Sequence, residues 1–306
     1  MIFDKIGVKY PIIQGGMANI ATHELAAAVS NAGGLGLIGA GGWNADTVRD
    51  EIRKCRELTD KPFGVNIMLM SPHAEDISDM VIEEGVKVIT TGAGNPGPYM
   101  EKWKNAGITV IPVVASVALA KRIVRNGADA VICEGTEAGG HIGEISTMAL
   151  VPQVVDAVDV DVIAAGGIAD ARGVVAVQAL GAKGVQVGTA FLAAEECPIH
   201  INYKNTIVKA KDTSTIVTGR ITKAPVRVIK NKMAKEYIRL ANEGTNLEEL
   251  EKLTLGSLRK SVFDGDMEMG SVMAGQVAGM ITEVRTCKEI IENMFDTKSV
   301  IERLGK

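Results

Sequence analysis

The chain has few aromatic residues, few cysteines and no long apolar run. Only 11 of its 306 residues are Phe, Trp or Tyr, and its four cysteines lie at least 64 residues apart. This spacing contains no CxxC pair, so it predicts neither a disulfide framework nor a zinc site and is typical of a reducing cytosol. The longest mostly apolar stretch, Ile108–Ala120, has about 13 residues and includes Pro112. A membrane-spanning helix needs about 20 residues.

A strong excess of either charge is also absent. The formal charge is −4 at pH 7, which argues against general nucleic-acid binding, because that function leaves a strongly basic footprint. The first residues, Met-Ile-Phe-Asp-Lys, lack the charged-then-apolar layout of a signal peptide. With 46% hydrophobic and 23% charged residues, the composition is globular rather than disordered. We expect a cytoplasmic protein that binds neither nucleic acid nor membrane.

Glycine is the residue present in excess. The chain has 34 glycines, above the usual share of about 7%. They cluster in short loops between apolar runs and follow no collagen-like period. Glycine in such places indicates backbone that turns tightly or comes close to a ligand.

Short apolar segments alternate with segments of helical pattern from Tyr10 to Thr189. The predicted strands are Pro11–Gln14, Leu35–Ile38, Phe63–Met68, Val86–Thr90, Thr109–Ala115, Ala130–Cys133, Asp161–Ala165 and Gly184–Val187. The predicted helices are Glu24–Asn31, Ala45–Leu58, Ala74–Glu84, Tyr99–Ala106, Val117–Asn126, Met148–Val158 and Ala171–Leu180. The strands are nearly continuous apolar runs, as expected of a parallel sheet covered on both faces.

This alternation predicts an α/β fold, a (β/α)8 TIM barrel whose last helix comes later in the chain. An open doubly wound sheet is the competing interpretation, and it normally places one glycine fingerprint after its first strand. Here polar or glycine-rich loops follow all the predicted strands except the second. A barrel with its active site at the carboxyl ends of the strands requires that distribution.

After Thr189 the alternation stops. We interpret residues 197–260 as a smaller, mainly helical insertion after the eighth strand, and residues 1–196 and 261–306 as the barrel. Between residues 201 and 240, ten cations oppose only Asp212 and Glu236, a net charge of +8. The cations are Lys204, Lys209, Lys211, Arg220, Lys223, Arg227, Lys230, Lys232, Lys235 and Arg239. The chain then returns through a segment of small residues, 270–279.

Two glycine loops favour a phosphate site. Ala165-Gly166-Gly167-Ile168 follows the seventh predicted strand, and Gln186-Val187-Gly188-Thr189 ends the eighth. In TIM barrels these two loops frequently bind phosphate together with a helix N-terminus. Glycines let amide groups approach the anion, and the positive helix end attracts it. The competing interpretation is ordinary tight turns.

Other loops at the same end carry polar residues. Asn66 lies in an otherwise apolar strand, so its amide needs either backbone partners or the edge of a heterocycle. Ser116 either contacts a ligand or caps the helix that follows it. His141 lies between glycine-rich turns after the sixth strand. It is suited to proton transfer, unless it is only a solvated loop histidine.

Several other kinds of site are not supported. The chain has no HExxH motif, His/Cys cluster or paired carboxylates, so we expect no transition metal. It has no GxSxG motif and no cysteine in an activating loop, which argues against a nucleophilic triad. His23, His73 and His200 lie in weaker contexts than His141, and we interpret them as structural.

Taken together, the motifs resemble those of the flavin-dependent nitronate monooxygenase-like superfamily. The resemblance rests on Pro11–Met17, Gly64–Asn66, Glu137–His141, Ala164–Ile168 and Gln186–Thr189. Within that superfamily, residues 134–143, the basic insertion and residues 270–276 are more similar to enoyl-acyl-carrier-protein reductase II. The resemblance extends from Asp4 through Gly279, nearly the whole chain.

The resemblance implies FMN at the open end of the barrel. The residues implied are Gly16, Met17 and Asn66 along the ring, Ser116, Glu137 and Gly139 near the ring or the ribityl chain, Gly166, Gly167, Gly188 and Thr189 around the phosphate, and Met273 and Gln276 close by. It also implies a response to a monovalent cation such as K⁺ or NH4⁺, with no ligands assigned, and a homodimer.

The implied reaction is reduction of a trans-2-enoyl thioester by NADH or NADPH through FMN. His141 would orient the substrate or supply a proton to its α-carbon. The basic insertion would steer an acidic acyl carrier protein, unless it is only a solvated helical face. The rivals are a nitronate monooxygenase, which would use His141 as a base and O2 as oxidant, and a non-catalytic flavin- or phosphate-binding barrel. The choice between NADH and NADPH, the acyl-chain length and the oligomeric state stay open.

Overall fold

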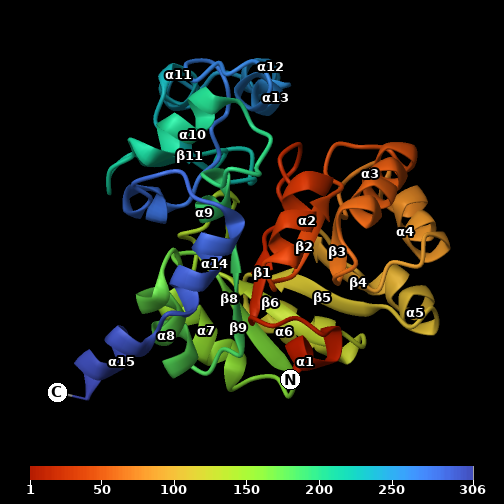
Figure 1. Cartoon of the computed structure of the whole chain (residues 1–306). Coiled ribbons are helices and arrows are strands. Elements are labelled where there is room, and N and C mark those ends of the chain that lie inside the picture. Colours follow the sequence, from red (N-terminus) through yellow and green to blue (C-terminus); the bar gives the residue numbers. More distant parts are fainter. Residues whose placement is uncertain (306) are drawn as a thin grey trace.

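The computed structural model describes residues 1–305, and its centre is a barrel of eight parallel strands (Figure 1). Around the barrel the strand order is β1-β9-β8-β6-β5-β4-β3-β2. A parallel bridge between Ile13 and Leu35 joins β1 to β2 and closes the ring. The strands are β1 Ile12–Gln14, β2 Gly36–Gly39, β3 Phe63–Met68, β4 Val88–Gly92, β5 Thr109–Val114, β6 Ala130–Glu134, β8 Asp161–Ala165 and β9 Gly184–Val187. The predicted TIM barrel is confirmed.

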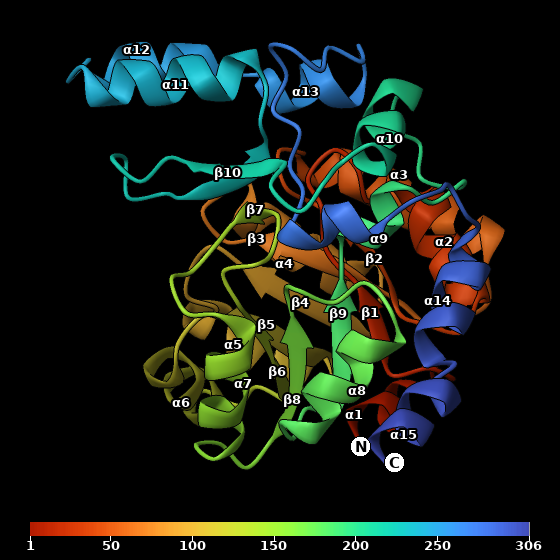
Figure 2. The ribbon, with the colours of Figure 1, turned by 90° about the vertical axis from the view of Figure 1, so that its left-hand side faces the viewer.

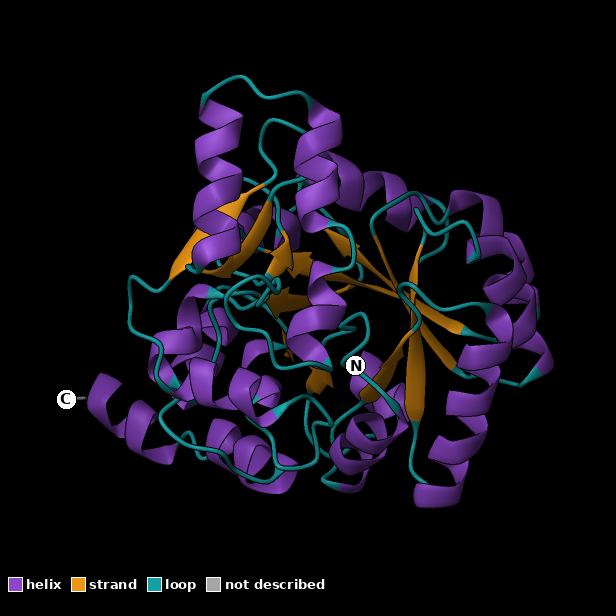
Figure 3. Ribbon diagram, turned by 90° about the horizontal axis from the view of Figure 1, so that it is seen from above, coloured by secondary structure: helices purple, strands orange, loops and turns teal. Residues whose placement is uncertain are grey.

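Helices surround the barrel, as the view from above shows (Figure 3). Those that alternate with the strands are α2 His23–Asn31, α3 Ala45–Leu58, α4 Ala74–Glu83, α5 Gly97–Asn105, α6 Val117–Arg125, α7 Thr147–Val155 and α8 Ala171–Ala179. The remaining place, between α8 and α2, is taken by α14 (Cys287–Phe295). The last helix of the barrel therefore does come later in the chain.

Side chains alternate between two cores because successive residues of a strand point to opposite faces. One set, including Ile13, Leu35, Ile132 and Ile163, fills the inside of the barrel. The other set packs between the strands and the helices. Helix α1 (Ile2–Ile6) adds Ile2 and Phe3 to the inner core and so covers the amino ends of the strands. The carboxyl ends and their loops, which we call the barrel mouth, are thereby left for a ligand.

Residues after β9 build a unit over the barrel mouth (Figure 2). The short helix α9 (Thr189–Leu192) comes first, and α10 (Ile201–Val208) follows it. An antiparallel hairpin of β10 (Thr215–Thr218) and β11 (Val226–Ile229) then precedes three helices. These helices are α11 Lys232–Asn242, α12 Leu247–Thr254 and α13 Ser257–Val262. Residues 270–280, here called the return segment, end in the 3-10 helix η1 (Gln276–Met280), and α15 (Lys298–Leu304) follows α14.

The hairpin was not expected from the sequence. The hairpin belongs to a three-stranded sheet. The third strand is β7 (Gly140–His141), which comes from the barrel loop that carries His141 and pairs antiparallel with β11. The pairs are Val226 with His141 and Arg227 with Gly140. The inserted unit is therefore joined to the His141 loop by backbone hydrogen bonding. Within residues 1–305, no helix combines the length and apolar character needed to span a membrane.

Candidate active site

Polar side chains point inward at the barrel mouth. Glu134 is in register with Ala165, which is in register with Gln186. Residues in register on parallel strands face the same side of the sheet, and Ala165 belongs to the inner core. Glu134 and Gln186 therefore face the inside of the barrel at its open end. On the other side of the mouth, Asn66 donates a hydrogen bond from Nδ2 to Thr90 Oγ1 at 2.9 Å.

Gln186 has an unusual position for an amide side chain. The residue is 7% exposed, and its Oε1 accepts no hydrogen bond within residues 1–305. Leaving a buried acceptor unpaired costs about 1–3 kcal/mol, so a donor from a ligand would satisfy a need that the protein leaves open. The edge of a flavin ring offers such an N–H donor.

Close contacts join three loops at one side of the mouth. A Cβ atom on Gly16 would lie 2.2 Å from Asn66 Cγ, so only glycine fits at this position. The Sδ atom of Met17 lies 3.5 Å from where a Cβ atom on Gly188 would be. The loops after β1, β3 and β9 thus meet at residues predicted to line a flat ligand ring.

A second set of contacts joins the His141 loop (residues 135–143) to the return segment. Gln276 N–H donates to the carbonyl of Glu137 at 2.9 Å, and Gly275 N–H donates to Thr189 Oγ1 at 2.9 Å. The Glu137 carboxylate accepts from both the backbone N–H and the hydroxyl of Thr147, at 2.9–3.0 Å. Glu137 therefore holds its own loop against α7.

The predicted phosphate loops have the backbone that the glycines suggested. Gly166 and Gly167 have φ of +87° and +77°, which only glycine adopts without strain. The first turn of α8 offers less than expected, because the Asp170 side chain already accepts from its amides and pairs with Arg172. The positive end available beside these loops is that of α9, the short extra helix that phosphate-binding TIM barrels commonly use.

Ser116 is placed differently from the other predicted residues. Its hydroxyl accepts from Leu119 N–H at 3.2 Å and caps α6. The capping role considered from the sequence is confirmed, while a contact with cofactor stays a prediction. Of the remaining predicted residues, Asn66 lies within β3, Met273 and Gln276 lie in the return segment, and the others lie on segments that follow barrel strands.

His141 lies at the edge of a cavity of about 660 Å³ between the mouth and the inserted unit. The cavity is bounded by barrel loops at Asn19 and by the hairpin at Val226. The helices α11, α12 and α13 of the inserted unit contribute apolar side chains to its lining, among them Met233, Leu250 and Leu258. The imidazole is exposed to this space but is closely surrounded by protein, and this desolvation lowers the pKa of His141. This shift favours the neutral form of the imidazole.

Arg227 is a site residue that the sequence analysis treated only as surface charge. It is 6% exposed. Its Nε and Nη2 donate to the carbonyl of Thr136 at 3.2 and 2.9 Å, and its Nη1 donates to Thr215 Oγ1 at 3.3 Å. One guanidinium thus ties both strands of the hairpin to the His141 loop. In the sequence, Arg227 is one of ten cations between residues 201 and 240, and nothing in its position distinguishes it from the others.

Glu134 and Gln186 were also missed as site residues, although both lie within motifs that the sequence analysis quoted. The available signal was their inward position at the ends of strands that are otherwise apolar. This inward position can be inferred only when the strand register is known, because a shift of one residue would turn both side chains outward.

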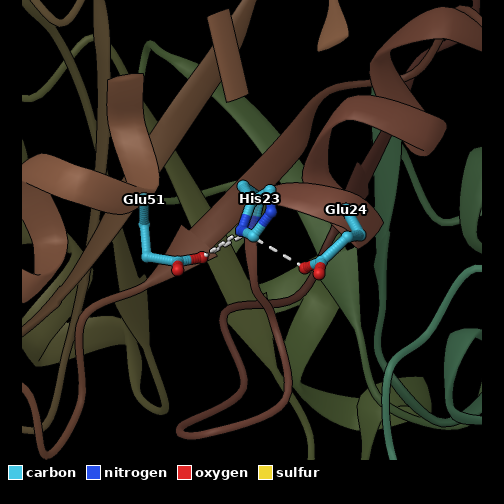
Figure 4. Close-up of side chains that lie close together, drawn as sticks. All are labelled: His23, Glu24 and Glu51. Atoms are coloured by element: carbon cyan, nitrogen blue, oxygen red, sulfur yellow. Dashed lines mark hydrogen bonds and ion pairs between the residues drawn. The ribbon is translucent and has the colours of Figure 1, made fainter. Parts of the chain in front are cut away.

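One other cluster has side chains of the kind that ligate metal ions, and it lies on helices α2 and α3 (Figure 4). His23, Glu24 and Glu51 place their donor atoms within 4.8 Å of one another. However, Glu51 Oε2 accepts from both the backbone N–H and Nδ1 of His23, at 2.8 Å each. The cluster therefore holds the start of α2 against α3, in agreement with the structural role expected for His23.

The fold and the site define a cofactor-binding (β/α)8-barrel enzyme. The chain belongs to the nitronate monooxygenase family, whose model matches residues 1–297. A probable nitronate monooxygenase of Staphylococcus saprophyticus is 36% identical, with 94% of each chain covered. A relative from Mycobacterium tuberculosis is 32% identical over 94% of this chain and 93% of that one. It is named (3aS,4S,5R,7aS)-5-hydroxy-7a-methyl-1-oxo-octahydro-1H-indene-4-carboxyl-CoA dehydrogenase.

Two solved structures are also similar. FabK from Thermotoga maritima has a TM-score of 0.97 and 49% identity, covering 99% of this chain and 97% of that one. A nitroalkane oxidase from Streptomyces ansochromogenes has a TM-score of 0.86 and 28% identity, covering 97% and 98%. The chain is thus an oxidoreductase of the nitronate monooxygenase family with a FabK-like structure, and this family implies a flavin.

Proposed function

We propose that this protein is an FMN-dependent enoyl-acyl-carrier-protein reductase, which reduces trans-2-enoyl thioesters with NADH or NADPH. The observation that carries the proposal is the cavity between the barrel mouth and the inserted unit, which is lined by His141 and by apolar side chains of α11, α12 and α13. An acyl chain needs such a chamber, whereas a small nitronate does not. The 49% identity to FabK supports the same activity.

FMN fits the residues at the barrel mouth. Gly16, Met17 and Asn66 would lie along the ring, and Gln186 Oε1 would accept its N–H. Gly166, Gly167, Gly188 and Thr189 would hold the phosphate through backbone amides near the start of α9. Glu137, Gly139, Met273 and Gln276 would form the wall beside them. When bound, FMN supplies the transfer of hydride between the nicotinamide and the enoyl thioester.

The role of His141 follows from its protonation state. A neutral imidazole keeps one N–H, which can donate a hydrogen bond to the thioester carbonyl where negative charge develops. Because burial lowers the pKa of His141, we propose that it orients and polarises the substrate rather than storing the proton for the α-carbon.

Nitronate oxidation is the second candidate function. A neutral His141 is also suited to act as a base. The curated relative from Staphylococcus saprophyticus is named a probable nitronate monooxygenase. A monooxygenase would need O2 and no nicotinamide.

The two functions are separated by an anaerobic titration. NADH or NADPH should bleach the flavin absorption of the purified protein, and a crotonyl thioester should then restore it without O2. Failure of both steps, together with O2-dependent turnover of a nitronate, would replace the reductase by the monooxygenase. A purified protein that neither contains nor takes up FMN would contradict both.

The basic stretch needs a correction before it can be used as a docking surface. Lys204 is buried and donates to the carbonyls of Ala194 and Glu195, and Arg227 is buried as described. Arg220 pairs with Glu144, and Arg239 pairs with Glu236 and Glu243. The exposed cations of this stretch without an ion pair within residues 1–305 are Lys209, Lys211, Lys223, Lys230, Lys232 and Lys235. The surface charge is therefore smaller than the sequence count.

We predict that Lys232 and Lys235, which are exposed on α11, help to bind an acidic carrier protein. The double variant Lys232→Glu/Lys235→Glu should raise KM for an enoyl-acyl carrier protein by roughly tenfold at low salt, because charge complementarity mainly affects encounter. The KM for the same acyl group on coenzyme A should change much less. An equal rise for both substrates, or none for the carrier protein, would remove this docking surface.

Arg227 provides a further prediction. Arg227→Met keeps the apolar stem but leaves the Thr136 carbonyl without its donor, so the His141 loop should lose its support from the hairpin. We expect kcat to fall by about 10-fold, as for loss of one hydrogen bond to a charged group, with FMN retained. Hydrogen exchange at residues 136–142 should become faster. Unchanged exchange and kcat would show that backbone pairing alone holds the loop.

Three further expectations rest on the family resemblance. A homodimer can be checked by light scattering, and activation by K⁺ or NH4⁺ by assays in tetramethylammonium buffers. The inserted unit, residues 197–260, is proposed to be the part that covers the substrate.

A further inference from the structure

Glu134 is an acidic side chain in a place where acids are rarely found. It is the last residue of β6 and faces the inside of the barrel mouth, in register with Ala165 of the inner core. The residue is half-buried, and the protein packed around it desolvates its carboxyl group. In this position the carboxyl faces the space at the barrel mouth where a ligand is expected.

No charged group compensates for this burial. Glu134 forms no ion pair within residues 1–305, and its carboxylate accepts no hydrogen bond from the described chain. The flanking strands contribute Val113 of β5 and Ala165 of β8, and the adjacent Cys133 stays a thiol because burial raises its pKa to about 12. The segment after β6 carries the titratable groups of Glu137 and His141, and β11, which pairs with that segment, carries Arg227.

The physical consequence is a carboxyl that keeps its proton unusually long. Burial is the cause that raises the pKa of Glu134 to about 7, since desolvation disfavours the ionised form. Below neutral pH the side chain is therefore an uncharged acid that can donate a hydrogen bond. Above neutral pH it becomes an unpaired negative charge inside the mouth.

We propose that Glu134 holds a proton at the cofactor site and that its ionisation weakens the binding of FMN and its acceptance of electrons. The inference rests on the proposed function in one respect, the identity of the anionic cofactor. FMN brings a phosphate, and two-electron reduction by NAD(P)H adds further negative charge to the ring. A neutral Glu134 leaves the mouth free for that charge, whereas a carboxylate repels it through a medium of low dielectric constant.

The test compares the pH dependence of FMN binding in three variants of the full chain. The dissociation constant of FMN would be measured by quenching of flavin fluorescence between pH 5.5 and 9. In the wild type, affinity should fall by about tenfold or more as pH rises through about 7, as expected for a charge pair at short range. In Glu134→Gln it should stay nearly constant. The midpoint potential of the bound flavin should likewise fall more steeply with pH in the wild type.

Two control variants separate this role from a structural one. Glu134→Asp keeps a titrating group and should keep a pH-dependent affinity. Glu144→Gln makes the same chemical change at an exposed residue paired with Arg220 and should match the wild type. Parallel pH curves for the wild type and Glu134→Gln would overturn the proposal.

Thermal unfolding supplies a measurement that needs neither FMN nor activity. A folded-state pKa above the unfolded value of about 4.3 gives stability that is present at low pH and is lost as pH rises through about 7. The Tm of Glu134→Gln relative to the wild type should therefore be higher at pH 8.5 than at pH 4.5. An equal difference at both pH values would contradict a retained proton. A protein that fails with enoyl thioesters but shows both pH effects would refute the proposed function and leave this inference standing.

Discussion

Replacing His141 by alanine should lower kcat for an enoyl thioester by about 10²–10³-fold while FMN stays bound. Removing the donor of a hydrogen bond to a carbonyl oxygen that becomes negatively charged in the transition state lowers kcat by about this factor. The imidazole is at the edge of the substrate cavity, and only the backbone of His141 takes part in the pairing of β7 with β11. Alanine keeps that pairing, so the loss should concern the chemical step. Steady-state rates with crotonyl thioester would measure it.

His141→Gln is the matched variant, because it keeps an N–H donor at this position without a titrating group. We expect it to recover part of the lost rate and to show no change of kcat between pH 6 and 8. If His141→Ala retained wild-type turnover, His141 would not take part in the reaction. A variant that kept FMN but lost turnover would also exclude the interpretation as a non-catalytic flavin-binding barrel.

Replacing Gly139 by alanine should weaken both the fold and the binding of FMN. A Cβ atom at this position would lie 2.6 Å from the Ala274 carbonyl carbon and 2.7 Å from Gly275 N. Both are backbone atoms, so the His141 loop and the return segment must move apart. Overpacking of this kind costs about 1–3 kcal/mol, which lowers Tm by roughly 2–5 °C in a protein of this size. Calorimetry would give the loss of stability, and flavin fluorescence the loss of affinity.

Gly92→Ala is the control for this steric argument. Gly92 ends β4, also at the barrel mouth, but no atom lies within 4 Å of the position of its added Cβ. Without FMN, its Tm should stay close to that of the wild type. Equal destabilisation by the two substitutions would mean that the contact of Gly139 with the return segment does not matter for stability.

Much of the barrel could be predicted because its signals are local. The predicted strands Phe63–Met68, Asp161–Ala165 and Gly184–Val187 agree with β3, β8 and β9 residue for residue, and the predicted helix Ala45–Leu58 agrees with α3. Each apolar run in a parallel strand is buried on both faces, so the run itself marks the strand. The glycine loops were also recognisable from the sequence. Gly166 and Gly167 have positive φ, which strains other residues, so the backbone conformation itself requires glycine.

The inserted unit shows where local signals are insufficient. β10 and β11 have the β-branched pattern of strands, but they are short and stand among lysines. Their pairing with β7 depends on a loop from a distant part of the chain. The lysines and arginines were similarly counted as one surface, although Lys204 and Arg227 are buried and use backbone carbonyls as partners. Sequence spacing does not reveal which cations are buried.

The sequence by itself determined the excess of glycine in the loops, the order of strands and helices, and the family to which the chain belongs. These properties depend on residue type and on short-range backbone preference. Only the tertiary structure decided that Glu134 and Gln186 face the inside of the barrel mouth, that Arg227 joins the hairpin to the His141 loop, and that burial raises the pKa of Glu134. Register, burial and desolvation depend on which distant segments pack together. The scarcity of aromatic side chains did not by itself indicate a barrel mouth lined by backbone and amide groups.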